Sequence, residues 1–205
     1  MSQRGRPRTF DRDDALRRAM ELFWEKGYGG ASLADLTETM GINSPSLYAA
    51  FGSKQALFDE AVDLYARTES PEIWEALSVE PTARDAVASF LRLTALSFSR
   101  PGKPAGCLIV LGALHDSDAS AEACAALRRH RAENVEAVRA RLERGIAEGD
   151  VPAGTDCETV ARFFLTVQQG MSIQARDGAT RERLHALAEG AMAAWDGLVG
   201  ATATR

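Results

Sequence analysis

Few side chains in this sequence are arranged as a catalytic or metal-binding group would require. The cysteines are odd in number, widely spaced and without a C-x-x-C pair, which argues against a disulfide framework or a zinc module: Cys107, Cys124 and Cys157. The histidines fall on different predicted helices: His115, His130 and His185. The sequence has no nucleophile elbow, phosphate loop or histidine–carboxylate metal spacing. We therefore expect neither an enzyme nor a bound cofactor or metal.

The arginines near the start of the chain could contact DNA. Three of them, Arg4, Arg6 and Arg8, precede the first acidic residue, although the net charge of the whole chain is −5. Residues 1–54 carry a net charge of +1 and the remainder −6, so the positive charge is local. A local basic segment suits a small DNA footprint on an otherwise acidic protein. We predict that Arg6 and Arg8 contact DNA; the alternative is a disordered, solvated tail.

The elements that must position such contacts are helices, because helical periodicity dominates and no segment alternates as a strand would. The first predicted helix begins at Asp11, with Asp14 as its capping-box partner, and ends at Gly27. The next three helices have predicted caps at Ser32, at Asn43 or Ser44, and at Ser53, with predicted stops at Gly41 and Gly52. Four short helices therefore occupy the first third of the chain.

The second and third of these helices are joined by Gly41-Ile42-Asn43, which is the pattern of a helix-turn-helix. Gly41 can adopt the left-handed backbone that the turn needs, and Ile42 fills the angle between the helices. The third helix is short, so its first residues can enter a major groove about 12 Å wide. Its predicted exposed side chains are those of Ser44, Ser46, Tyr48 and Ala49.

The run from Thr9 to Phe58 resembles the N-terminal domain of the TetR family of transcriptional regulators. About fifty residues match in order without a gap. The matching pieces are Gly5-Arg6-Pro7-Arg8, Ala19-x-x-Leu22-Phe23-x-x-x-Gly27-Tyr28, Ser32-Leu33-Ala34-Asp35-Leu36, Met40-Gly41-Ile42 and Ser46-Leu47-Tyr48-x-x-Phe51-Gly52-Ser53-Lys54-x-x-Leu57.

The resemblance implies specific DNA contacts. Ser32 would contact a phosphate at the start of the second helix, although it could serve only as a helix cap. Lys54 would clamp the DNA backbone beside the first turn of the fourth helix. The recognition-helix contacts would be Ser44, Pro45, Ser46 and Tyr48; for Tyr48 the alternative is packing on Phe51. The family often has polar or aromatic residues where this chain has Ala49 and Ala50, and small or flexible ones where it has Pro45.

Periodicity also predicts the helices of the remaining chain. A short helix lies around residues 73–77, a long one follows Thr82, and the Pro101–Gly106 segment is the strongest break. The later predicted helices cover Cys107–His115, residues 119–149, residues 157–176 and residues 181–199. The last two are joined tightly and should lie antiparallel.

The last two helices carry more apolar surface than a solvent face would hold. Their stripe includes Phe163, Phe164, Val167, Met171, Met192 and Trp195. A single recognition helix reads only a few base pairs, so two copies related by a two-fold axis would read a palindrome. We predict a homodimer through residues 157–199, in which the same helices also contribute core; the alternative is that they are core alone.

The resemblance further implies a pocket for a small-molecule effector among the middle helices. The candidate lining residues are Trp74, Phe90, Phe98, Val110, His115, Phe164, Gln168 and Met171. Most of the apolar ones could equally be ordinary core residues. Gln168 could bond a ligand or cross the dimer interface, and His115 could cap a helix C-terminus.

Cys107 follows Gly106 at the predicted start of a helix, where the helix dipole would lower the pKa of its thiol. Some related regulators sense oxidants or electrophiles through a cysteine at a similar junction. The alternative is a small buried apolar residue.

These observations together predict an all-α protein. Residues 1–53 would form a three-helix helix-turn-helix DNA-binding domain, and residues 54–205 a helical-bundle domain for effector binding and dimerisation. The expected function is a ligand-responsive repressor that binds a palindromic operator as a homodimer; the alternative is a thiol-based sensor acting through Cys107. The sequence has no secretory signal and no apolar run of membrane-spanning length, so we expect a cytoplasmic protein.

Overall fold

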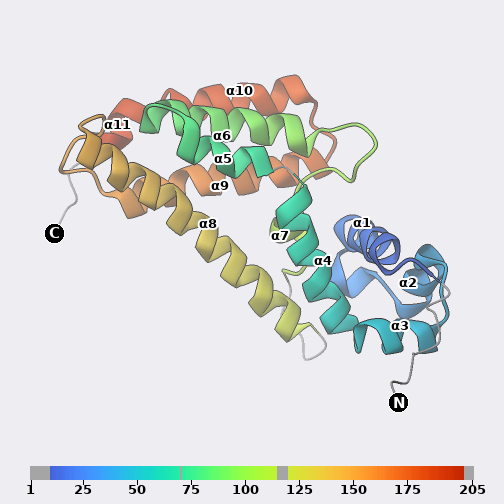
Figure 1. Ribbon diagram of the computed structural model, residues 1–205. Helices are drawn as coiled ribbons and strands as arrows, with labels where there is room; N and C mark the ends of the chain where they lie inside the picture. Colours follow the sequence, from blue (N-terminus) through green and yellow to red (C-terminus); the bar gives the residue numbers. More distant parts are fainter. Residues whose placement is uncertain (1–9, 70, 115–119, 201–205) are drawn as a thin grey trace, which may run out of the picture.

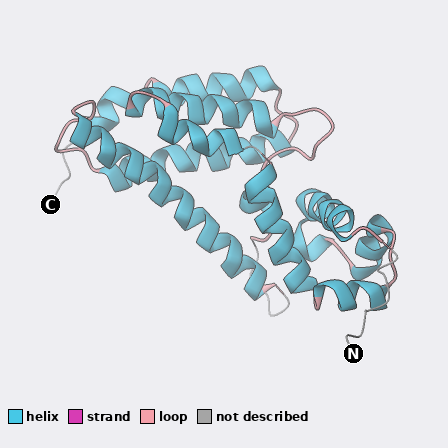
Figure 2. Cartoon of the chain, viewed as in Figure 1, coloured by secondary structure: helices cyan, strands magenta, loops and turns pink. Residues whose placement is uncertain are grey.

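The computed structural model describes residues 10–69, 71–114 and 120–200, and every regular element in these ranges is a helix (Figures 1 and 2). The elements are α1 (Arg12–Gly30), α2 (Leu33–Met40), α3 (Ser44–Phe51), α4 (Lys54–Thr68), α5 (Pro71–Val79), α6 (Ala83–Phe98), α7 (Leu108–Leu111), α8 (Ala121–Glu148), α9 (Cys157–Arg176), α10 (Arg181–Met192) and α11 (Trp195–Val199). The predicted all-α fold is confirmed.

Two groups of helices make up the molecule (Figure 1). Helices α1, α2 and α3 cluster at one end, and α5, α6, α9 and α10 pack together at the other. Helix α4 runs from the first group towards the second and packs against α1, α5, α7 and α8. The long helix α8 leaves the bundle and slants back towards α4, so that these two helices bridge the groups.

Local capping explains where α2, α3 and α4 begin. The Ser32 hydroxyl accepts the backbone N–H of Asp35, whose carboxylate accepts the backbone N–H of Ser32, so the predicted capping box is present. Asn43 and Ser53 cap α3 and α4 in one direction only: their side chains accept the backbone N–H groups of Ser46 and Ala56. A cap of this kind contributes about 1 kcal/mol, which is enough to set the start of a short helix.

The start and end of α1 follow the sequence less closely. Asp11 accepts the N–H groups of Asp13 and Asp14, but the Asp14 carboxylate pairs with Arg17 and Arg18, so only half of the predicted capping box forms. The predicted break at Gly27 is present as a kink with φ 70°, after which helical hydrogen bonding resumes to Gly30.

Two predicted helices of the second group are corrected. The helix expected over Cys107–His115 covers only Leu108–Leu111 within the described residues, because the Gly112 carbonyl turns away and accepts the N–H of Tyr28 at 2.7 Å. The helix expected over 181–199 divides into α10 and α11. At the break, the Ala194 N–H donates to the Ala191 carbonyl three residues back, and this tightened turn accompanies the packing of Trp195 on Phe164.

The segment from Pro101 to Gly112 connects the bundle to α1 through main-chain hydrogen bonds. The Trp24 indole N–H donates to the Gly106 carbonyl at 3.1 Å. Arg176, at the end of α9, donates to the carbonyls of Trp24 and Ala105. Because these bonds are specific to backbone positions, they fix the far end of α1 relative to the bundle.

None of the helices in the described part of the chain combines the length and the apolar character that crossing a membrane would require.

The close approach at Gly106 generates a test of this junction. A Cβ there would lie 2.6 Å from the Ser172 carbonyl oxygen, in addition to the strain of a φ of 78°. Gly102 has a similar φ of 77° and no atom within 4 Å of an added Cβ. We expect Gly102→Ala to lower the free energy of unfolding by about 1–2 kcal/mol from backbone strain. We expect Gly106→Ala to lower it by about 1–3 kcal/mol more from the clash.

Urea denaturation followed by circular dichroism measures both variants. Equal losses of stability would mean that the backbone of α9 does not press on the 101–112 segment in solution.

Candidate DNA interface and effector cavity

The exposed face of α3 carries the residues predicted to read DNA. Leu47 and Phe51 are buried and anchor the helix, whereas Ser44, Pro45 and Ala49 are exposed. The Tyr48 side chain is 46% exposed, so its ring is not taken up by packing on Phe51. Ser46 is half-buried, and its N–H is used by the Asn43 cap. The structure therefore presents a short, sparsely polar surface with one aromatic side chain.

Ser32 lies at the start of α2 and is fully engaged in its cap. Its hydroxyl donates to the Asp35 carboxylate at 2.6 Å. The Ser32 hydroxyl, the Lys26 ammonium and the Ser32 backbone N–H all donate to this carboxylate and hold the pKa of Asp35 well below its usual range. A phosphate contact by the Ser32 hydroxyl would have to share it with Asp35.

Lys54 braces the turn after α1. Its ammonium donates to the Tyr28 carbonyl at 2.7 Å and lies 4.4 Å from the centre of the Tyr28 ring. Burial lowers the pKa of Lys54. An ammonium has three N–H donors, so a DNA phosphate could still bind beside the Tyr28 carbonyl. The other predicted cationic contacts, Arg6 and Arg8, lie outside the described residues.

A cavity of about 140 Å³ lies between the two groups of helices, where α4, α5, α6, α8 and α9 meet. Its lining mixes apolar walls with several polar groups: Tyr65, Ala66, Glu69, Ile73, Trp74, Ser97, Phe98, Cys107, Ile109, His130, Asn134 and Gln168. An apolar engineered cavity of about 150 Å³ holds a benzene molecule, so this space suits a small ligand.

The structure brings three of the predicted lining residues to this cavity, namely Trp74, Phe98 and Gln168. Four others are buried but are not among its lining residues: Phe90, Val110, Phe164 and Met171. The Phe90 ring packs against the Trp74 ring at a centroid distance of 5.3 Å, and the Phe164 ring packs against the Trp195 ring at a centroid distance of 5.8 Å. His115 lies outside the described residues.

Cys107 lines the cavity, but its thiol is not activated. Its N–H donates to the Ser172 hydroxyl at 2.8 Å, and α7, which follows it, has only four residues. Burial raises the pKa of the Cys107 thiol, against the lowering effect of the Tyr65 hydroxyl. The predicted depression of this pKa is therefore wrong, because desolvation outweighs the short helix terminus.

The apolar stripe of the last helices divides between core and surface. Trp195, Phe164 and Met171 are buried within the chain. Two large apolar side chains remain open on the same pair of helices, Ile173 on α9 at 48% exposure and Leu187 on α10 at 44%. These two residues offer the surface on which a second copy could pack.

Comparison with known proteins agrees with this arrangement. The family described as "Bacterial regulatory proteins, tetR family" matches residues 15–61, and the family described as "Tetracyclin repressor-like, C-terminal domain" matches residues 83–189. The chain belongs to the TetR family. The second match covers more than half of the chain and most of the bundle that follows the helix-turn-helix.

Several TetR-family proteins are similar over nearly the whole chain. The transcriptional repressor ComR of Escherichia coli K12 is 37% identical over 96% of this chain and 94% of its own length. BdcR of the same organism is 35% identical over 90% of this chain and 88% of its own. The solved structure of the regulator CifR, a cysteine mutant in complex with 26-bp double-strand operator DNA, is 49% identical. It covers 93% of this chain and 100% of its own, with a TM-score of 0.90.

Several cavity residues of this TetR-family chain were missed by sequence reasoning. Tyr65 lies near the end of α4, and Glu69, the residue that follows this helix, is four residues further along the chain. His130 and Asn134 are likewise four residues apart on α8. Polar pairs at this spacing on otherwise apolar faces were the available signal, since residues i and i+4 share one side of a helix.

The contact of Lys54 with Tyr28 generates a stability prediction. Lys54→Met would leave the Tyr28 carbonyl without this donor and would remove the cation from the ring face. We expect a loss of about 1–2 kcal/mol in the free energy of unfolding. Lys26→Met serves as the control, because Lys26 forms an exposed ion pair with Asp35 that contributes below about 1 kcal/mol.

Chemical denaturation of both variants in parallel gives the comparison. If Lys54→Met is as stable as the parent chain while DNA binding is lost, Lys54 acts on DNA alone and not as a brace.

Proposed function

We propose that this chain is a transcriptional repressor that binds a palindromic operator as a homodimer and is released by a small-molecule effector. The observation that carries the proposal is the exposed recognition helix α3 on a fold that matches CifR, which was solved on operator DNA. Helix α4 contributes Tyr65, Ala66 and Glu69 to the cavity lining and also packs against α1 of the DNA-binding end, an arrangement suited to control of DNA binding by a ligand. We infer that the protein is not an enzyme and acts in the cytoplasm, where its operator would be.

The proposed DNA contacts fall into two kinds. Arg6, Arg8, Ser32 and Lys54 would bind phosphates or the minor groove, and would position the domain without reading sequence. Ser44, Pro45, Ser46 and Tyr48 would face the major groove. The proposed boundary between the DNA-binding and effector domains lies at Ser53, whose hydroxyl caps α4.

The homodimer would form through residues 157–199. Exposed Ile173 and Leu187 support this proposal, because their apolar side chains are open to water in the single chain and would be buried on association. Two recognition helices related by a two-fold axis would then read half-sites about one helical turn apart, or a multiple of this distance.

The effector would bind in the 140 Å³ cavity beside Trp74, Phe98 and Gln168. Cys107 contributes a wall of this cavity, so it is a candidate contact for the effector. The alternative of thiol-based sensing has less support, because burial raises the pKa of the Cys107 thiol and disfavours the reactive thiolate.

Selection of binding sequences from random DNA duplexes tests the function directly. We expect the selected sites to share a two-fold symmetric pattern. Tyr48→Ala should then weaken binding to that site by about 1–3 kcal/mol, a contribution typical of a base contact. Tyr48→Phe separates the hydroxyl from the ring, and thermal unfolding of both variants should match the parent, because the side chain is exposed. Binding that is blind to sequence and lost in moderate salt would contradict a regulator.

The proposed interface predicts the effect of charge on the two open apolar residues. The double variant Ile173→Glu, Leu187→Glu should be a folded monomer whose operator affinity falls by about a hundredfold or more, since a monomer reads one half-site. Val79→Glu is the matched control, because Val79 is 66% exposed on α5, outside residues 157–199. Sedimentation velocity gives the mass of each variant. A double variant that remains dimeric would place the interface on another surface.

A further inference from the structure

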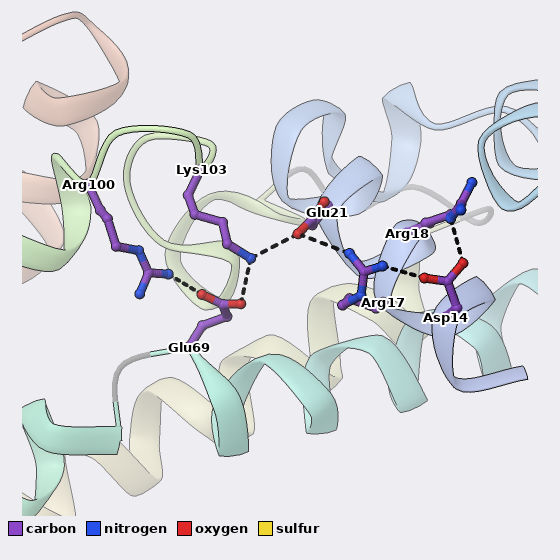
Figure 3. A network of polar contacts seen from close by, with 7 residues as sticks. All are labelled: Asp14, Arg17, Arg18, Glu21, Glu69, Arg100 and Lys103. Atoms are coloured by element: carbon purple, nitrogen blue, oxygen red, sulfur yellow. Dashed lines mark hydrogen bonds and ion pairs between the residues drawn. The ribbon is translucent and has the colours of Figure 1, made fainter. Parts of the chain in front are cut away.

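Glu69 lines the cavity and also belongs to an ion-pair network. Glu69 caps the end of α4, its side chain is only 9% exposed, and it is one of the residues lining the cavity. One carboxylate oxygen accepts from the Arg100 guanidinium, and the other accepts from the Lys103 ammonium at 2.9 Å. Figure 3 shows the carboxylate held between these two cations.

Lys103 extends this network to α1, the first helix of the group that also contains α2 and α3. Its ammonium also donates to Glu21 of α1 at 2.8 Å, so a single cation bridges the end of α4 and the outer face of α1. Glu21 in turn lies 3.9 Å from Arg17, which pairs with Asp14 at the start of the same helix (Figure 3). Despite partial desolvation, the carboxylates of Glu21 and Glu69 raise the pKa of Lys103, which is therefore charged at neutral pH.

We propose that Glu69 recognises a protonated amine in the effector, and that this amine displaces Lys103 and so breaks the link between the cavity and α1. The inference rests on the proposed function, because it assigns the chemical class of the effector and the first step of its action. The juxtaposition that carries it is a buried carboxylate shared between a cavity and a bridging lysine.

The charges around the cavity favour a cationic ligand. Among the described residues that line it, Glu69 is the one with a carboxylate, and none is an arginine or a lysine. The cations that pair with Glu69, Arg100 and Lys103, are not lining residues, and the His130 imidazole, which does line the cavity, already lies 3.5 Å from the Glu133 carboxylate. An anionic ligand would therefore meet the Glu69 carboxylate without a free cation in the lining, which is costly in a weakly screened site. A protonated amine would instead keep Glu69 paired, while Ile73, Trp74 and Phe98 enclose its apolar part.

Lys103 is the partner that can leave. Both cations reach solvent, with side chains 26% exposed for Lys103 and 38% for Arg100, but the Lys103 ammonium is a compact, strongly hydrated charge on a flexible stem and returns to water more readily than a guanidinium. Arg100 would remain on the other oxygen of Glu69. The exchange therefore replaces one cation by another at Glu69, and what it removes is the connection from Glu69 to Glu21.

Three ligands of one shape separate charge from size: benzylammonium, benzyl alcohol and benzoate. Isothermal titration calorimetry on the full-length chain gives binding, and fluorescence anisotropy on a selected operator duplex gives release. We expect benzylammonium to bind at least about tenfold more tightly than the other two and to weaken operator binding.

Two variants test the proposed route. In Glu69→Gln, benzylammonium affinity should fall about tenfold or more, because the ligand loses its counter-charge. In Lys103→Met the ligand no longer competes with a lysine, so it should bind as tightly as before or more so, yet change operator affinity less than about twofold. Glu72→Gln and Arg67→Met, both at exposed positions near the network, are the matched controls and should respond as the parent does.

Several results would overturn the proposal. If benzyl alcohol or benzoate bound as tightly as benzylammonium, the proposed chemical class would be refuted. It would also be refuted if benzylammonium showed no binding at about 10 mM, a concentration at which even a weak specific contact is detected. Full operator release by benzylammonium in Lys103→Met would refute the bridge, even if Glu69→Gln does not fold. If the parent chain without ligand did not bind the operator at all, that result would instead count against the proposed function itself.

Discussion

The arrangement of the molecule depends on how the end of α1 is joined to the segment from Pro101 to Gly112. The Tyr28 N–H donates to the Gly112 carbonyl, and the Trp24 indole donates to the Gly106 carbonyl. Both acceptors are main-chain atoms, and Gly106 lies so close to α9 that a Cβ would clash with the Ser172 carbonyl. Small residues are required here because three backbones approach one another, which leaves little freedom for α1 to tilt independently.

This junction places the cavity and the DNA-binding helices in mechanical contact. Cys107 lies directly after Gly106 and forms part of the cavity wall, while Arg176 ties the end of α9 to Trp24 and Ala105. A change in the cavity can therefore reach α1 through a few bonded contacts. Such a change acts on DNA binding only if the effector favours one position of α1 over another.

Charged groups complement these backbone contacts in a different way. The bond from the Trp24 indole to the Gly106 carbonyl is buried, whereas the Glu69–Lys103–Glu21 bridge is partly exposed and can exchange partners. The pair of Lys103 with Glu21 is the more exposed half of this bridge, and such a pair contributes about 0–1 kcal/mol. This ion pair can exchange partners while the hydrogen bonds beside it stay fixed, and a regulator controlled by a ligand needs such an exchangeable contact.

The sequence by itself determined the helix-turn-helix and most helix boundaries. The caps at Ser32, Asn43 and Ser53 and the left-handed turn at Gly41 depend on hydrogen bonds within a few residues, so the local pattern contains them. The periodic apolar stripes likewise predicted that α8 and α9 are long helices. The family resemblance rested on these same local features.

Only the tertiary structure decided which residues share the cavity and the junction. Tyr65, Trp74, Cys107, His130 and Gln168 come from separate parts of the chain, and periodicity cannot distinguish a cavity wall from a core contact. The division of the last predicted helix and the shortness of α7 also depend on distant packing. Burial then reversed the expected pKa shift of Cys107, and residues far apart in sequence, such as Glu21 and Lys103, formed the network. Desolvation and long-range pairing arise from the neighbours that folding brings together, and the order of residues alone does not specify them.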